Sequence, residues 1–109
     1  MKKWCIEYWD DRTGNNSLEK WFDKLTDEQL KSVSKEIRLL EVLGNTLRLP
    51  HSKALAEGLF ELRERRFGFR IYYCFCDNTL IFLLAAGDKK SQDRDIRIAR
   101  LRLKQVIER

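Results

Sequence analysis

Apolar and polar residues alternate along two segments in the second half of the chain, residues 58–66 and 69–76. Such alternation is typical of β-strands whose two faces meet different surroundings. A third segment, residues 79–86, is almost continuously apolar, as in a strand that is covered on both faces. Short turn sequences, one with glycine and one with aspartate followed by asparagine, separate these segments. The pattern therefore predicts an antiparallel meander.

The first half of the chain predicts one strand and a helical hairpin. Aromatic residues alternate over residues 4–9, which indicates a strand. Two capping-box signatures, beginning at Asn16 and Thr26, precede segments in which apolar residues recur at helical spacing. The first helix is expected to end near Leu25 and the second at Gly44. Each helix has one apolar stripe, so we expect the hairpin to pack on one face of the sheet.

The remaining segments complete the predicted fold. Residues 45–56 are expected to form a loop, and residues 91–107 a final basic helix. The apolar arc of that helix is predicted to contain Ile96, Ala99, Leu103, Val106 and Ile107. Together the elements predict an α+β fold with a small antiparallel sheet, in the order β-α-α-β-β-β-α. A single domain is expected to span residues 1–109.

The composition narrows the classes of protein to consider. No apolar run approaches the roughly 20 residues that a membrane helix requires, and the N-terminal residues contain no apolar stretch of signal-peptide length. We therefore expect a cytoplasmic protein that makes no membrane contact. The chain has three cysteines, one histidine and no Cys-x-x-Cys motif, which argues against a zinc site. We expect neither a metal nor another cofactor.

The net charge of +5 is unevenly distributed. Residues 1–52 contain nine basic and nine acidic residues, whereas residues 89–109 contain eight basic and three acidic residues. Arg97, Arg100 and Lys104 form a stripe beside the apolar arc of the predicted final helix. A basic surface confined to one part of the chain indicates a polyanion partner such as nucleic acid. A solvated basic helix is the alternative interpretation.

Two arginines occupy the predicted meander on the side away from the aliphatic residues. Arg63 lies in the first strand and Arg70 in the second. Two guanidinium groups on one face of a sheet suggest an anion site. They also fit the solvated face of a half-buried sheet, where alternating charges are common. The residue types alone leave both interpretations open.

Four motifs carry a resemblance to a known superfamily. In chain order they are LPHSKAL (49–55), GLFELR (58–63), FRIYY (69–73) and LLAAGDKKSQDRDIRIA (83–99). Their order resembles that in the RelE/ParE superfamily of bacterial toxins from toxin–antitoxin modules. The motifs look most like the HigB-type branch of phage-derived or addiction-module killer proteins. The chain departs from that branch at Ala86, where glycine is usual, and at Phe69, where tyrosine is common.

The resemblance implies a small microbial RNase fold and a toxin of a type II module. Such toxins cut mRNA, many of them on the translating ribosome, and a separate antitoxin neutralises them. That antitoxin is often a helix-turn-helix DNA-binding protein. The superfamily also contains ParE-like gyrase inhibitors, so the fold alone does not fix the activity. A non-catalytic RNA-binding module is a further alternative.

The resemblance also implies roles for individual residues in a metal-independent endoribonuclease. Arg63 and Arg70 would clamp the reacting phosphate, and Lys89 would contact the phosphate or the leaving group. The residues expected to bind the RNA backbone are Lys53, Arg65 and Lys90, together with Arg97, Arg100 and Lys104. His51 and Tyr72 are both candidates for the general base, and the sequence does not choose between them.

Overall fold

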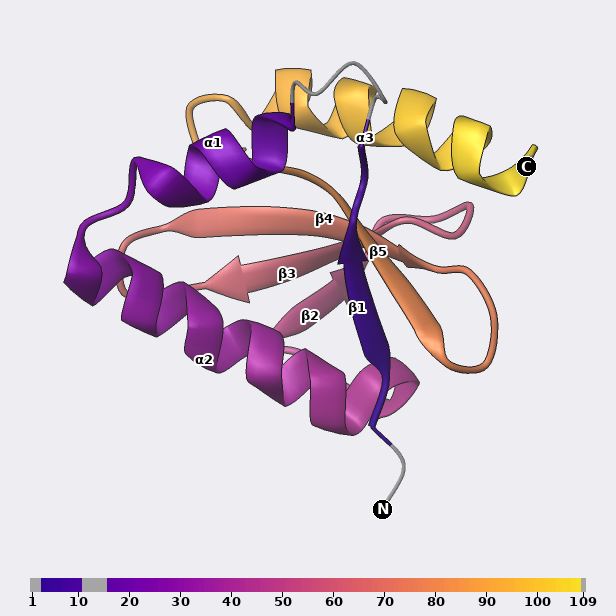
Figure 1. The fold of residues 1–109 in the computed structure, drawn as a ribbon, viewed down its shortest axis with the longest axis horizontal. Coiled ribbons are helices and arrows are strands. Elements are labelled where there is room, and N and C mark those ends of the chain that lie inside the picture. Colours follow the sequence, from indigo (N-terminus) through magenta and orange to yellow (C-terminus); the bar gives the residue numbers. More distant parts are fainter. Residues whose placement is uncertain (1–2, 11–15, 109) are drawn as a thin grey trace.

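One five-stranded sheet with the strand order β1-β5-β4-β3-β2 organises the structure (Figure 1). The structure is a computed structural model, and it describes residues 3–10 and 16–108. The strands are β1 (Cys5–Tyr8), β2 (Ser52–Ala54), β3 (Phe60–Glu64), β4 (Phe69–Phe75) and β5 (Leu80–Asp88). The helices are α1 (Ser17–Asp23), α2 (Asp27–Leu43) and α3 (Gln92–Ile107), with a short 3-10 helix η1 (Gly44–Thr46) after α2.

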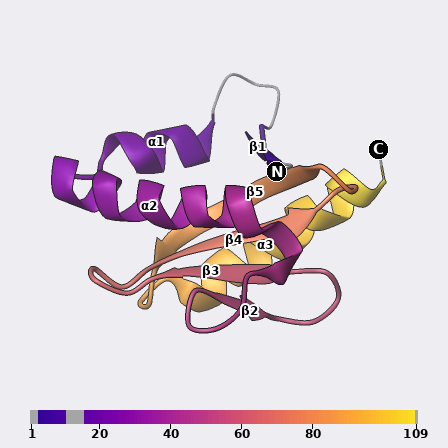
Figure 2. The same ribbon diagram turned by 90° about the horizontal axis from the view of Figure 1, so that it is seen from below.

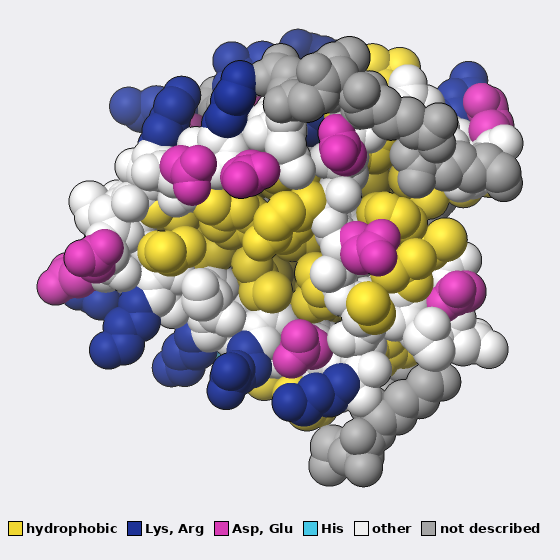
Figure 3. Space-filling view, in the orientation of Figure 1, with side chains coloured by type: hydrophobic (Ala, Val, Ile, Leu, Met, Phe, Trp, Pro, Cys, Tyr) yellow, Lys and Arg dark blue, Asp and Glu magenta, His cyan; other side chains and the backbone are white. Residues whose placement is uncertain are grey.

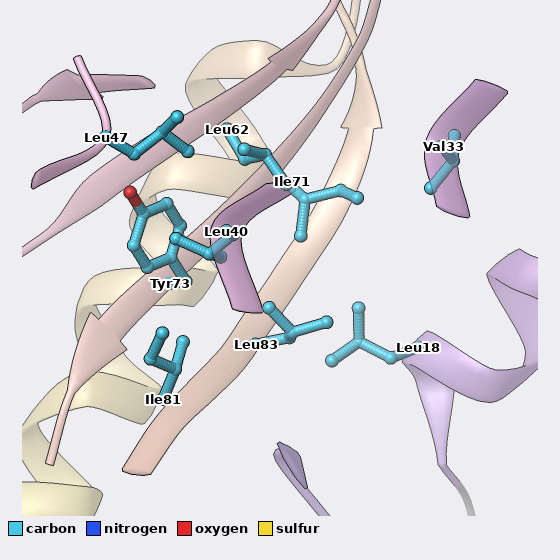
Figure 4. Packing of buried hydrophobic residues seen from close by; sticks show 9 residues of the cluster. All are labelled: Leu18, Val33, Leu40, Leu47, Leu62, Ile71, Tyr73, Ile81 and Leu83. Atoms are coloured by element: carbon cyan, nitrogen blue, oxygen red, sulfur yellow. The ribbon is translucent and has the colours of Figure 1, made fainter. Parts of the chain in front are cut away.

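Helices cover both faces of the sheet, so the central strands are buried on both sides. α1 and α2 lie on one face and α3 lies on the other (Figures 1 and 2). The core under α1 and α2 contains Leu18, Val33, Leu40, Leu47, Leu62, Ile71, Tyr73, Ile81 and Leu83 (Figure 4). The core under α3 contains Tyr72, Cys74, Leu84, Ala99, Leu103 and Val106, among others. The nearly continuous apolar sequence of β5 is explained because its side chains enter both cores.

The predicted α+β fold and its antiparallel meander are confirmed. β3 pairs with β4, and β4 with β5, in antiparallel register. The sheet as a whole is mixed, because β1 runs parallel to β5. The structure also contains β2, which pairs with β3 inside the segment predicted to be a loop. Its three residues are too few to show an alternating pattern, and its position follows from pairing with β3.

The caps of α2 confirm the predicted helical hairpin. Thr26 and Gln29 form a reciprocal capping box, and Gly44 ends the helix with a positive φ of 51°. The Trp4 ring occupies the space that a side chain on Gly44 would need. α1 ends at Asp23, slightly before the expected end at Leu25. None of the helices in the described ranges is both long and apolar enough to cross a membrane.

Two predicted side-chain positions are wrong. Ile107 is 72% exposed, because it lies at the end of α3 beyond the sheet that the apolar arc contacts. Arg65 does not continue the β3 face, because β3 ends at Glu64. The buried Glu64 carboxylate accepts backbone N–H groups from Arg66 (2.7 Å) and Phe67 (3.1 Å), which turns the chain. Arg65 therefore lies in a turn rather than in a strand.

Candidate active site

Two neighbouring strands place Arg63 and Arg70 directly opposite each other on the α3 face of the sheet. The Cα register pairs Arg63 of β3 with Arg70 of β4, and Arg70 with Gly87 of β5. Their strand neighbours Leu62 and Ile71 enter the core under α1 and α2, so the arginines point to the other face. Like charges directly opposite each other destabilise an antiparallel pair. A compensating charge is therefore required nearby.

Glu61 supplies that charge from within the sheet. Its side chain is 1% exposed, and its Oε1 atom lies 2.8 Å from Arg63 Nε and 3.6 Å from Arg70 Nε. Its other oxygen, Oε2, accepts a hydrogen bond of 3.0 Å from Gln92 Nε2 at the start of α3. One buried carboxylate thus joins both guanidinium groups and the first turn of α3.

The contacts of Glu61 fix how the guanidinium groups present their remaining donors. Both arginines approach Glu61 through Nε, and within the described residues their terminal Nη atoms have no hydrogen-bond or ion-pair partner. The side chain of Arg63 is 30% exposed and that of Arg70 is 19% exposed. Paired N–H groups in this arrangement match the oxygens of a phosphate. The arginines are therefore partly buried and positioned, and they do not belong to a freely solvated sheet face.

The connection from β5 to α3 brings α3 close to this cluster. The Asp88 carboxylate accepts backbone N–H groups from Lys90 (2.9 Å) and Ser91 (3.1 Å), and so closes the turn before the helix. Ser91 Oγ donates to the buried Asp95 carboxylate. Gly87 leaves room for this contact, because a Cβ atom there would collide with the side chains of Asp95 and Ser91. The α3 start is thus held against β5.

We expect Gly87→Ala to destabilise the fold by roughly 1–3 kcal/mol, because the added methyl group forces Asp95 or the start of α3 to move. Chemical denaturation would measure the change in the free energy of unfolding. Ala86→Gly is a control for altered backbone freedom at the neighbouring position. An unchanged stability in Gly87→Ala would show that the start of α3 shifts at no cost.

Tyr72 is also in this region, but its properties oppose a role as general base. It is fully buried, and its hydroxyl has no hydrogen-bond partner within the described residues. Burial, and then the charges of Glu61 and Asp95, raise the pKa of Tyr72 well above its ordinary value. The raised pKa keeps the phenol protonated at neutral pH, which disfavours Tyr72 as the general base.

We expect Tyr72→Phe to leave the free energy of unfolding unchanged, or to raise it by up to about 1 kcal/mol, because the variant removes a buried hydroxyl without a partner. Thermal denaturation would test this. We also expect any RNA cleavage to continue at a rate within a few fold of the wild type. A large loss of cleavage rate at unchanged stability would instead show that the Tyr72 hydroxyl takes part in the reaction.

His51, the other candidate base, is directed toward α2. Its Nδ1 atom lies 3.0 Å from the Glu36 carboxylate, and its side chain is 32% exposed. Its backbone carbonyl nevertheless accepts the Arg63 N–H at 2.8 Å. The backbone of His51 is therefore beside the arginine cluster, while its ring contacts the helix on the opposite face of the sheet. The structure does not bring the ring together with Arg63 and Arg70.

The predicted lysines lie at the margins of the cluster. Lys53 is exposed on β2 and pairs in register with Glu61. Lys89 is exposed in the turn after β5, two residues beyond Gly87, the register partner of Arg70. Lys90 is in the same turn and lines a hollow beside α1. Arg65 lines a different hollow, beside α2.

The three residues of the predicted basic stripe on α3 have different surroundings in the structure. Arg97 and Lys104 are exposed. Arg100 instead donates to the backbone carbonyls of Leu55 (2.8 Å) and Ala56 (3.4 Å). Ala56 has a positive φ of 78°, so Arg100 supports an unusual backbone turn. Arg97 and Lys104 therefore remain exposed, whereas the guanidinium group of Arg100 is hydrogen-bonded within the fold.

Sequence reasoning missed Glu61, Gln92 and Asp95 as parts of this site. The alternation did place Glu61 on the arginine face, and its position in the middle of a charged strand was the available signal. Gln92 and Asp95 become recognisable only when α3 is docked. The described residues contain no group of three or more His, Cys, Asp or Glu side chains placed to hold a metal ion.

Comparison with known proteins gives three findings. The model of the family described as Phage derived protein Gp49-like matches residues 20–104. An uncharacterised protein of Haemophilus influenzae is 33% identical over 87 residues, which cover 78% of this chain and 84% of that protein. The structure of a mutant of the E. coli toxin RelE in the free state is similar with a TM-score of 0.59 at 13% identity. That similarity covers 89% of this chain and 97% of the RelE chain, and it shows a shared fold.

Proposed function

The chain belongs to the Phage derived protein Gp49-like family and has the fold of RelE, and from this premise we propose that it is a toxin of a type II toxin–antitoxin module. Its activity is metal-independent cleavage of mRNA on the ribosome in the cytoplasm, as in HigB-type toxins. Its partner is a cognate antitoxin with a helix-turn-helix DNA-binding domain. The observation that carries the enzymatic part is the pair Arg63 and Arg70, held by one buried carboxylate with their terminal donors unpaired.

The arrangement of the arginines suits phosphoryl transfer within RNA. A ribose 2′-oxygen attacks the adjacent phosphorus, the bond from phosphorus to the 5′-oxygen breaks, and a cyclic phosphate remains. The 2′-hydroxyl loses its proton to a water molecule, and the departing 5′-oxygen gains a proton from water. Negative charge grows on the phosphoryl oxygens in the transition state, where fixed guanidinium groups stabilise it. We assign contact with the phosphate or the leaving oxygen to Lys89, which is exposed in the turn after β5, two residues beyond the register partner of Arg70.

The rate enhancement comes from charge stabilisation and substrate orientation, and not from a side-chain base. Tyr72 stays protonated, and the His51 ring faces α2. Action on the ribosome agrees with this division of roles, because the ribosome can orient the RNA for in-line attack.

We expect expression without a partner to stop growth, with mRNA as the damaged molecule. In vitro translation followed by primer extension would detect cleavage within the translated message. Variants at Arg63 and Arg70 provide the negative controls. Intact mRNA combined with blocked DNA supercoiling would overturn the nuclease proposal in favour of gyrase inhibition. RNA binding without cleavage would indicate a non-catalytic module.

A further inference from the structure

A groove runs between α1 and α3 beside the C-terminal half of β5. Two hollows of about 410 and 510 Å³ form it, and they share Trp21, Ala86 and Arg94. The edge of β5 forms the floor of the groove. This edge is open because β1 pairs with β5 only as far as Leu83. Beyond that residue, α1 and α3 stand on either side of the strand and no other strand covers this edge within the described part of the chain.

The rim of the groove is basic. Lys20 of α1 and Lys24, the residue that caps the C-terminus of α1, line it on one side, and Arg94 of α3 lines it on the other with its side chain 69% exposed. Lys90 lines the end nearest the β5–α3 turn. Figure 3 shows Lys and Arg side chains gathered along the margin of the molecule above α1. Arg102 adds a further charge at the opposite end of the groove, where it bonds Ser17 and the Leu84 carbonyl.

The acidic residues in the groove offset only part of this charge, because five basic side chains line the two hollows against two acidic ones, Asp88 and Asp95. Asp95 Oδ1 lies 3.7 Å from Arg94 Nε and so pairs with one of the rim cations. The Asp88 carboxylate accepts backbone N–H groups of the β5–α3 turn. Asp95 is buried and accepts from Ser91 Oγ. The groove therefore presents a net positive lining to any ligand.

An aromatic side chain lies where the two hollows meet. Trp21 is partly buried and lines both of them, and its ring makes edge contacts with Phe22 and Phe69. A basic groove that contains a fixed aromatic ring is the usual means of binding single-stranded nucleic acid without sequence preference. The cations follow the backbone and the ring offers a surface on which a base can stack.

The groove also connects with the arginine cluster. Gly87 lines the groove and pairs in register with Arg70. The turn with Lys89 and Lys90 follows the end of β5, and Lys90 lines the groove. A chain of basic residues therefore leads from the cluster, around the first turn of α3, to the rim of the groove.

We infer that this groove binds the single-stranded RNA that flanks the scissile phosphate, an inference that rests on the proposed function. Lys20, Lys24 and Arg94 contact backbone phosphates, and Trp21 stacks on a base. An acidic peptide could also use the basic rim, but it would gain little from Trp21 and has no reason to continue toward Arg70. The continuity with the cluster favours RNA.

The test uses the intact protein and single-stranded RNA of about ten nucleotides, which is long enough to fill such a groove. Full 2′-O-methylation removes the attacking hydroxyl, so binding is measured without cleavage. In fluorescence anisotropy, Lys20→Gln/Lys24→Gln/Arg94→Gln is expected to weaken binding about tenfold or more at low salt. The negative slope of log K against log salt is expected to become shallower by about 2, because three phosphate contacts are lost. Binding of a trinucleotide should change much less.

The matched control is Lys31→Gln/Lys35→Gln/Arg38→Gln on α2, which removes the same charge from exposed positions outside the groove. It should leave the salt slope close to that of the wild type. If both triple variants weaken RNA binding equally, the effect comes from the overall positive charge and not from the groove, and the inference is overturned. Binding of poly-glutamate is measured in parallel. If the groove variant loses poly-glutamate binding and keeps wild-type RNA binding, the groove binds an acidic protein partner and the inference is overturned.

These outcomes are separable from failure of the proposed nuclease. If the wild type binds RNA through the groove and cleaves none, the groove stands and the nuclease proposal falls. If the wild type cleaves mRNA and the groove variant binds and cleaves like the wild type, the groove inference falls alone. Circular dichroism of each variant verifies that it is folded.

Discussion

Arg63→Lys and Arg70→Lys are each expected to slow RNA cleavage about a hundredfold, while the free energy of unfolding changes by less than about 1 kcal/mol. Lysine keeps a positive charge beside the buried Glu61 carboxylate, so the fold retains its charge balance. An ammonium group cannot pair with Glu61 and at the same time present paired N–H groups to a phosphate, as a guanidinium can. Single-turnover cleavage and chemical denaturation, measured on the same preparations, would test both parts.

The alanine variants are expected to lose stability as well as activity. The strand alternation suggests that Arg63→Ala and Arg70→Ala would leave the fold intact, because neither side chain contacts the aliphatic core. The structure changes that expectation, since removing one guanidinium weakens the compensation of a carboxylate that is 1% exposed. Leaving a buried charge without its partner is costly. The lysine variants therefore separate catalysis from folding better than the alanine variants do.

Arg66→Lys is the matched control for the lysine variants. Arg66 follows the same strand, but its guanidinium is 62% exposed and pairs with the exposed Glu28 at 3.3 Å. We expect wild-type cleavage and wild-type stability in this variant. Full cleavage in both Arg63→Lys and Arg70→Lys would remove bidentate phosphate binding from the mechanism and favour a role outside catalysis.

Local patterns predicted those parts of the fold that local chemistry determines. The meander follows from alternation and turn residues. The ends of α2 were predictable because residues next to each other in the sequence form its caps, Thr26 at the N-terminus and Gly44 at the C-terminus. β2 was missed because its three residues become a strand only by pairing with β3. The parallel alignment of β1 with β5 likewise depends on residues far apart in the sequence.

The candidate site was only partly predictable for the same reason. Alternation correctly placed Arg63 and Arg70 on one face, since neighbouring strands preserve that relation. The alternation could not show that α3 covers the face with Arg63 and Arg70. The same pattern also fits arginines on a solvated face. The direction of the His51 ring and the burial of Tyr72 both depend on helix packing. Glu61 gained its meaning only when Arg63, Arg70 and Gln92 were found around it.

Glu61→Gln is expected to slow RNA cleavage without weakening RNA binding. The substitution keeps the shape of the side chain but removes the buried negative charge between two guanidinium groups. The local positive charge rises, so binding of uncleavable RNA should remain as tight as in the wild type or become tighter. The guanidinium groups lose the carboxylate that orients them, so the rate of single-turnover cleavage should fall about tenfold to a hundredfold. Stability should fall by roughly 3 kcal/mol, because a buried ion pair loses one partner.

Glu64→Gln is the matched control for this prediction, because Glu64 is also buried and lies three residues away. Its carboxylate holds the turn after β3 and accepts a hydrogen bond of 2.9 Å from Ser32 of α2, away from the arginine cluster. We expect Glu64→Gln to lose stability while its folded fraction cleaves RNA at the wild-type rate. If Glu61→Gln behaves in the same way, Glu61 stabilises the sheet and does not position the arginines. A slower rate with undiminished RNA binding, seen in Glu61→Gln alone, would establish the positioning role, since loss of stability lowers both measurements together.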